Sequence, residues 1–212
     1  MNSLKKQFIE FTLNHEILRF GTFTLNSGRQ SPYFFNTGLC NNGKLLSSLA
    51  KFYSKCIIEN AIEYDFIFGP AYKGITLASS ISHTLYSDNS VSKPFCYNRK
   101  EAKTHGESGI FVGYQPKGAA IIVDDVISSG NSITESIKLL ETNNAHPTSV
   151  VVAFDRMEVG SKKRASVELS ENYDVSVYSI ITLEDIVSHI KSDASLTKYI
   201  SKMEDYMNEY KR

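Results

Sequence analysis

Apolar positions along this 212-residue chain follow two spacings, and together they predict a mixed α/β fold. Nearly continuous apolar runs, such as residues 119–123 and 148–154, have the length of buried strands. Apolar residues three and four apart, such as Leu45, Leu49 and Phe52, indicate helices between them. Strands that alternate with helices favour a mostly parallel central sheet flanked by helices. Ligands of such folds bind beyond the carboxyl ends of the strands, where we expect the site.

Local signals place some element boundaries. Ser132 with Glu135, and Thr182 with Asp185, have the spacing of a capping box, which predicts two helix starts. Residues 98–109 are too polar and too rich in glycine for a core element, so they are predicted to be a loop. An amphipathic helix is expected at the start of the chain, marked by Phe8, Phe11, His15 and Leu18.

Charge and cysteine content narrow the class of protein. Lysine plus arginine and aspartate plus glutamate number 23 each, and this balance argues against a nucleic-acid surface. Cys40, Cys56 and Cys96 are widely scattered, so the sequence supports neither a disulfide framework nor a zinc site. No leader-type apolar segment or membrane-length run is found, so we expect a cytoplasmic protein without membrane contacts.

The stretch VDDVISSGNS, residues 123–132, carries the most unusual chemistry. Asp124 and Asp125 end an apolar run, and a turn of small residues then leads into a helical pattern. The N–H groups of such a turn and the helix dipole can hold a phosphate, whereas two carboxylates suit sugar hydroxyls or a developing positive charge. A ribose 5-phosphate meets both demands. The alternative is a helix-start turn with two solvated acids.

Other polar clusters could complete such a site. Lys73 lies in the glycine-flanked stretch GPAYKG, and residues 98–109 carry several cations that suit a mobile lid over a pyrophosphate. The alternative for that segment is a solvated loop. Residues 33–35 are aromatic and could form either a platform for a planar base or part of the core.

These motifs resemble a known family. VDDVISSGNS resembles the phosphoribosyl pyrophosphate (PRPP) signature of the type I phosphoribosyltransferases. FTLNSGRQSPYFFN, FGPAYKG, NRKEAKTHGE and SIITLEDI resemble the orotate phosphoribosyltransferases, in register from about residue 5 to the last helix. The resemblance implies one phosphoribosyltransferase domain over residues 1–212. It also implies an N-terminal helix and base-binding hood within residues 1–40, and a mobile lid over residues 98–109.

The resemblance also implies residue roles. Asp124 and Asp125 would hold the ribose, Ser128 to Ser132 would surround the 5-phosphate, and Ser128 would also lie near the base. Residues 72–73 would flank the pyrophosphate. The residues implied in catalysis are Lys73, Lys100, Lys103, His105, Asp124 and Asp125. The residues implied in substrate binding are Asn26, Phe34, Phe35, Tyr72, Lys73, Arg99, Lys100, Lys103, His105, Asp124, Asp125, Val126, Ile127, Ser128, Ser129, Gly130, Asn131, Ser132 and Arg156.

The implied reaction is transfer of the phosphoribosyl group from PRPP to orotate, which gives orotidine 5'-monophosphate and pyrophosphate. Mg²⁺ would be held mainly through PRPP, and a homodimer would share its lids between subunits. His105 or Lys103 could pass a proton to the pyrophosphate. Asn26 stands where the family commonly has a lysine, so either the enzyme is slower or Lys73, Arg29 and the lid compensate.

Two other functions are compatible with parts of this pattern. A purine phosphoribosyltransferase would share the PRPP signature, but Arg156 and residues 31–36 favour a base that carries a carboxylate. A PRPP-sensing regulator would bind the ligand without turnover, but it would not need the cations of the lid.

Overall fold

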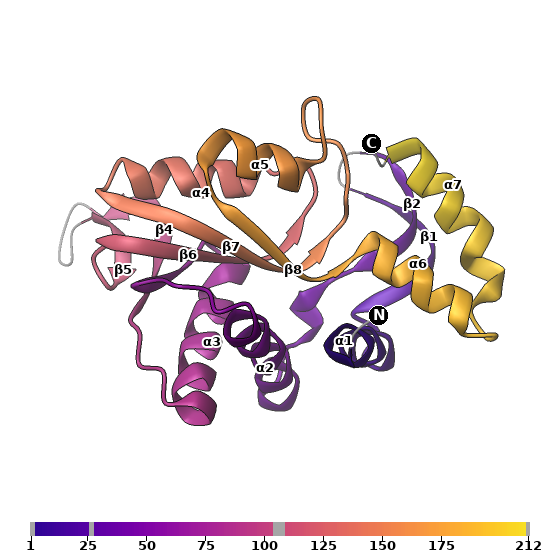
Figure 1. The fold of residues 1–212 in the computed structure, drawn as a ribbon, viewed down its shortest axis with the longest axis horizontal. Coiled ribbons are helices and arrows are strands. Elements are labelled where there is room, and N and C mark those ends of the chain that lie inside the picture. The colour runs from indigo at the N-terminus through magenta and orange to yellow at the C-terminus, as the bar shows by residue number, and fades with distance from the viewer. Residues whose placement is uncertain (1–2, 26–27, 104–108, 211–212) are drawn as a thin grey trace.

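The computed structural model describes residues 3–25, 28–103 and 109–210. Its centre is a six-stranded sheet with the order β5-β4-β3-β6-β7-β8 (Figure 1). Neighbouring strands are parallel except for β5, which is antiparallel to β4. The predicted mostly parallel sheet is therefore confirmed. The strands are β3 (Phe66–Gly69), β4 (Phe95–Lys103), β5 (Gly109–Gly113), β6 (Gly118–Ile127), β7 (Ala145–Asp155) and β8 (Ser176–Thr182).

Helices cover both faces of this sheet, with α2 and α3 on one face and α4 and α5 on the other (Figure 1). Side chains alternate between the faces, so Ile121 and Val123 of β6 join one apolar cluster and Ile122 joins the other. Burial on both faces explains why these strands are nearly continuous apolar runs. The helices are α1 (Ser3–Asn14), α2 (Gly43–Glu59), α3 (Lys73–Asn89), α4 (Asn131–Glu141), α5 (Ala165–Tyr173), α6 (Leu183–Ser192) and α7 (Ile200–Tyr210).

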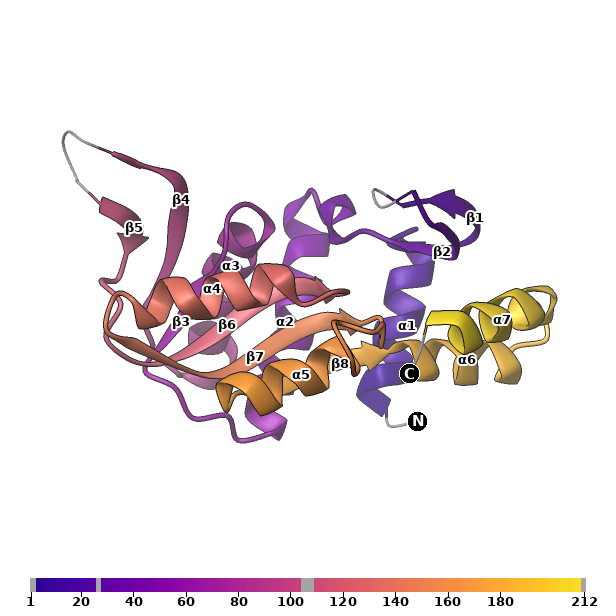
Figure 2. The ribbon, with the colours of Figure 1, turned by 90° about the horizontal axis from the view of Figure 1, so that it is seen from above.

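A separate two-stranded antiparallel ribbon consists of β1 (Leu18–Thr24) and β2 (Gln30–Phe35). Helix α7 contacts β2, so the last helix packs on the ribbon formed near the start of the chain (Figure 2). Short 3₁₀ helices follow β2 at Thr37–Leu39 and precede α7 at Thr197–Tyr199.

The loop prediction for residues 98–109 is wrong over residues 98–103, which form the end of β4. Asn98 pairs with Phe111 and Lys103 pairs with Gly109 in an antiparallel hairpin at the edge of the sheet. Lys100 and Glu101 are exposed in this hairpin, so the polar pattern reflects an edge strand and not the absence of a strand.

Other boundaries also differ from the sequence prediction. The Thr182–Asp185 capping box is confirmed, but α4 begins at Asn131 after Gly130, without a side-chain cap. The Ser132 hydroxyl points instead to Asp124, at 3.4 Å from its Oδ2. Helix α1 ends at Asn14, so His15 and Leu18 lie beyond it. Helix α5 was not predicted, because it buries only three of its residues, Ala165, Ser166 and Leu169.

Gly69, the last residue of β3, and Gly74, the second residue of α3, approach each other closely. A Cβ at Gly69 would lie 1.9 Å from the carbonyl oxygen of Gly74. We therefore expect Gly69→Ala to lower the free energy of unfolding by about 3 kcal/mol, because backbone atoms would have to move apart. Urea unfolding measures this change.

Gly43→Ala is the matched control, since a Cβ at this first residue of α2 would have no heavy atom within 4 Å. We expect it to change stability by no more than about 0.5 kcal/mol. Equal unfolding midpoints for the two variants would contradict the argument from close packing.

Candidate active site

Asp124 and Asp125 are buried neighbours near the carboxyl end of β6, each 9% exposed. The strand continues to Ile127, so the aspartates lie slightly inside the strand and not at its end as predicted. Because successive side chains of a strand point to opposite faces, Asp124 turns toward α4 and Asp125 toward α3. Each carboxylate therefore has its own set of partners.

Asp125 forms an ion pair with Lys73, the first residue of α3. Lys73 Nζ lies 2.6 Å from Asp125 Oδ2, and the Thr37 hydroxyl donates to the same oxygen at 3.1 Å. Half of the Lys73 side chain remains exposed, and it lines a cavity of about 310 Å³ together with Thr37 and Tyr72. The ammonium group is thus held by a buried carboxylate while it faces space that an anion could enter.

Asp124 has weaker partners. Its Oδ1 accepts from the N–H of Asp125 at 2.8 Å, and the Tyr53 hydroxyl donates to its main-chain carbonyl at 2.7 Å. Burial, and then the adjacent Asp125 carboxylate, raise the pKa of Asp124 to about 7, although the Asp125 N–H, Ser132 and Lys73 act in the opposite direction. The charge of this carboxyl group is therefore sensitive to ligands and to pH near neutrality.

The turn after β6 leads directly into α4. Gly130 has a φ of 81°, which favours glycine, and the first helical residue is Asn131. Ser129, Asn131 and Ser132 are exposed, and Ser128 is half-buried. The positive end of the α4 dipole and these small residues can bind a phosphate group. Of the other implied residues of this segment, Val126 is half-buried and Ile127 is buried.

The edge hairpin packs beside the loop that precedes Lys73. The amide N–H of Ala71 donates to Asn98 Oδ1 at 2.9 Å, and Lys100 Nζ lies 4.7 Å from the ring centre of Tyr72. Tyr72 is 68% exposed. Lys100 and Tyr72, which were assigned to the pyrophosphate from sequence, are therefore neighbours.

Several implied residues are placed elsewhere or not described. Arg99 donates to the carbonyl oxygen of Phe111 at 3.3 Å, across the hairpin. The Lys103 backbone ends β4, but its side chain, His105 and Asn26 lie outside the described residues.

The aromatic residues of the β1–β2 ribbon divide between core and surface. Tyr33 and Phe35 point inward, and the Phe35 ring centre lies 5.1 Å from that of Phe154. Phe34 points to the other face, where it stacks with Phe23 at 5.5 Å. Tyr33 and Phe35 therefore belong to the core, whereas half-buried Phe34 can contact a ligand.

Arg156 lies at the end of β7, with its side chain only 13% exposed. Its Nε donates to Glu158 at 2.8 Å, and its Nη2 donates to the Tyr206 hydroxyl at 2.9 Å. Glu158 and Tyr206, like Thr37 and Asn98, are contacts of the site that the sequence motifs do not predict. The only sequence signal for Glu158 is its position two residues after Arg156, and the sequence around Tyr206 gives no signal.

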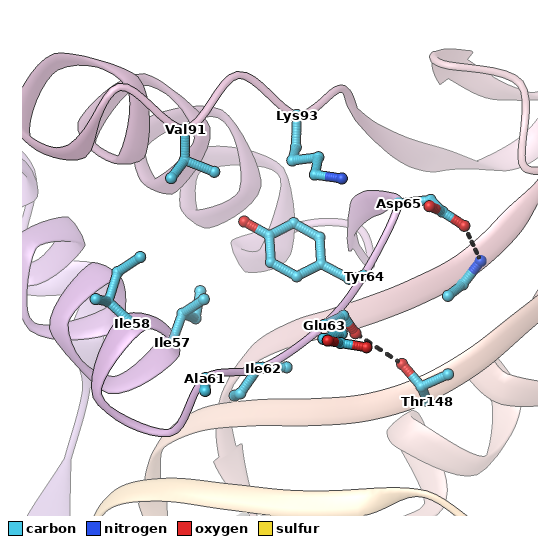
Figure 3. Close-up of a pocket in the computed structure, with 11 residues that line it drawn as sticks. Ile57, Ile58, Ala61, Ile62, Glu63, Tyr64, Asp65, Val91, Lys93 and Thr148 are labelled. Carbon is cyan, nitrogen blue, oxygen red and sulfur yellow. Dashed lines mark hydrogen bonds between the residues drawn. The ribbon is translucent and has the colours of Figure 1, made fainter.

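A larger cavity, of about 750 Å³, lies at the opposite end of the strands, near their amino ends (Figure 3). Its lining includes Tyr64, Lys93, Ala119 and Thr148, which lie at or before the amino ends of their strands. This cavity contains none of the acidic, basic or small-residue motifs described above, so volume alone does not identify the site.

Comparison with known proteins defines the class. The family model described as "Phosphoribosyl transferase domain" matches residues 40–193, which contain the whole central sheet. This range also contains the aspartate pair and the turn after β6, so the chain belongs to the phosphoribosyltransferase family.

The relatives narrow this class further. Orotate phosphoribosyltransferases of Hahella chejuensis and Vibrio cholerae are 43% and 41% identical over 211 residues, covering 99% of this chain and 98% and 99% of those proteins. The crystal structure of the Francisella tularensis orotate phosphoribosyltransferase has a TM-score of 0.85 at 37% identity, covering 97% of this chain and 100% of that one. The chain therefore belongs with the orotate phosphoribosyltransferases.

The raised pKa of Asp124 leads to a pH-dependent prediction. The pKa of Asp124 in the folded protein, about 7, exceeds the ordinary 3.8, so ionising this group costs the folded state more than the unfolded state. Its contribution to stability is therefore complete below pH 4 and is lost as pH rises to 7. Asp124→Asn cannot ionise. We expect its free energy of unfolding to exceed that of the wild type by on the order of 2 kcal/mol at pH 8, with a much smaller difference at pH 4.5.

Urea unfolding of both proteins at the two pH values measures this difference, and the contributions of groups that do not interact with Asp124 cancel in the comparison. A difference that does not change with pH would mean that Asp124 is already ionised throughout this range.

Proposed function

We propose that this protein transfers the 5-phosphoribosyl group from PRPP to orotate in the de novo synthesis of UMP. The products are orotidine 5'-monophosphate and pyrophosphate. The full-length similarity to orotate phosphoribosyltransferases supports the choice of base. The observation that carries the reaction type is the buried carboxylate pair between a phosphate-binding turn and Lys73.

The aspartates answer a specific electrostatic need. As the bond between the anomeric carbon and pyrophosphate lengthens, positive charge develops on the ribose ring. Asp124 and Asp125 would accept hydrogen bonds from the ribose hydroxyls and stabilise this charge, while the turn at residues 128–132 would hold the 5-phosphate. A ribose hydroxyl that donates to Asp124 would favour its ionised form and lower its pKa.

The leaving group develops the opposite charge. Lys73 faces the cavity beside Tyr72, and Lys100 lies next to the same tyrosine. These ammonium groups, with the remaining cations of the lid, would stabilise the departing pyrophosphate. Either Lys103 or His105 would donate a proton to it. No covalent nucleophile is needed, because a ring nitrogen of orotate attacks the anomeric carbon.

The base would lie between the ribbon and the end of β7. Phe34 would contact the planar ring, and Arg156 would pair with the carboxylate of orotate. A purine has no such carboxylate, which is why this arrangement favours orotate.

Mg²⁺ would enter mainly as a complex with PRPP. Within residues 3–25, 28–103 and 109–210, no group of three or more His, Cys, Asp or Glu side chains could hold a metal ion. Carboxylate and phosphate oxygens suit Mg²⁺, so Asp124 and Asp125 could contact it through water. When bound, the ion would neutralise pyrophosphate charge.

The structure also bears on membrane association. None of the helices in the described part of the chain is long and apolar enough to cross a bilayer. The cytoplasmic location predicted from the sequence is retained as part of this proposal.

The choice of substrate can be tested directly. We expect orotate absorbance to fall only when PRPP and Mg²⁺ are both present, and adenine, hypoxanthine and uracil to remain unconsumed in parallel assays. Consumption of a purine would establish the alternative enzyme. Binding of PRPP without consumption of any base would identify a PRPP-sensing regulator.

We further propose a homodimer in which the lid of each subunit completes the partner's site. Lys103→Ala and Asp124→Asn should each reduce kcat by about 100-fold or more. Co-expressed as mixed dimers, they should recover about a quarter of wild-type activity, because half of the dimers are mixed and each has one intact site.

Each variant co-expressed with itself under a second tag is the control for incomplete inactivation. Mixed dimers that show only the sum of the two residual activities would mean that each lid serves its own subunit.

A further inference from the structure

Glu158 is the centre of a buried charge cluster at the end of β7. Its side chain is 4% exposed, yet it carries a carboxylate that needs compensation. Arg29 Nη2 lies 2.6 Å from one oxygen, while Arg156 Nε at 2.8 Å and the Tyr206 hydroxyl at 2.7 Å donate to the other. The cluster therefore joins the β1–β2 turn, the end of β7 and helix α7.

Besides its direct hydrogen bond to Glu158, Arg156 is linked to this carboxylate through the hydroxyl of Tyr206. Its hydroxyl accepts from Arg156 Nη2 at 2.9 Å and donates to Glu158. The Nε–Nη2 edge of the guanidinium is thus held at two points, and the Tyr33 ring centre lies 5.1 Å from its carbon. No hydrogen bond from Arg156 Nη1 to any described residue is found, so the end formed by Nη1 and Nη2 can still receive a planar carboxylate.

The charges of the cluster favour an anionic ligand. Arg29 and Arg156 contribute two positive charges, and Glu158 contributes one negative charge. The cluster therefore has a net charge of one positive unit, carried by Arg29 and Arg156, whose side chains are only 26% and 13% exposed. A carboxylate bound to the open end of Arg156 would balance it, whereas a neutral base would not.

We infer that Glu158 and Tyr206 are positioning residues that hold Arg156 ready for the carboxylate of the base. This inference rests on the proposed function, in which that base is orotate. Helix α7, which packs on the β1–β2 ribbon in Figure 2, is thereby part of the specificity of the site although it lies last in the chain.

The same cluster bears on Asn26, which stands where the family commonly has a lysine. Arg29 was one candidate to replace that cation. It is instead bound to Glu158, and its guanidinium carbon lies 4.6 Å from the ring centre of Tyr210. Arg29 therefore anchors the ribbon turn. Compensation for the cation missing at Asn26 would then come from Lys73 and the lid.

Tyr206→Phe removes one hydroxyl and keeps the ring contacts with Tyr33 and Tyr210. We expect the KM for orotate to rise about tenfold, because Arg156 loses one of its two fixed points. The KM for PRPP should stay within about twofold, since the PRPP residues lie on other elements. Tyr210→Phe, on the same helix, is the matched control and should leave both constants unchanged.

A second readout separates positioning from general loosening of the structure. Uracil lacks the carboxylate, so its inhibition constant should be the same in Tyr206→Phe and wild type. Glu158→Gln should raise the KM for orotate at least as much. Thermal melting of each free variant checks folding, and the shift of the melting temperature with orotate and pyrophosphate measures binding without turnover.

The inference, but not the proposed function, would be overturned by either of two results for Tyr206→Phe. One is a KM for orotate that changes less than twofold, and the other is a joint rise of the constants for orotate, PRPP and uracil. Absence of orotate turnover by the wild type would instead overturn the proposed function, and the inference with it.

Discussion

Two adjacent carboxylates buried on β6 are the constraint on which the site depends. A buried charge is costly unless it is paired or neutralised, and strand geometry sends the two side chains to opposite faces. Asp125 is paired with Lys73, the first residue of α3, and this helix start also makes the close contact of Gly74 with Gly69. Asp124 accepts hydrogen bonds from the Asp125 N–H and from Ser132, and its pKa is raised. One carboxylate is thus paired with a fixed cation, while the other is held by hydrogen bonds.

A second charge cluster lies around Glu158, beyond the end of β7. Both clusters use a buried carboxylate to hold a cation, Lys73 in one and Arg156 in the other, with part of the cation left open. Pre-positioned cations of this kind lose little freedom when an anion binds. The arrangement fits a reaction in which the pyrophosphate and the carboxylate of the base need separate positive charges, and the ribose between them needs negative charge.

Particular residues show where sequence reasoning succeeded and where it failed. Thr182 and Asp185 form the predicted capping box, and Asp185 keeps it while it also forms an ion pair with Lys5 at 2.8 Å. Ser132 has the same spacing, but its hydroxyl is directed to Asp124. Residues 98–103 have the composition of a loop and yet form an edge strand, because pairing with β5 supplies hydrogen bonds that composition does not reveal.

The sequence by itself determined the alternation of strands and helices, the mostly parallel sheet and the motifs that point to a ribose 5-phosphate. These features depend on the local order of apolar and polar residues, which sequence records directly. Only the tertiary structure decided that Asp124 and Asp125 face different helices, that Lys73 pairs with Asp125, and that Glu158 and Tyr206 hold Arg156. These contacts join residues far apart in the chain, such as Arg156 and Tyr206, and depend on how whole elements pack. No local pattern encodes them.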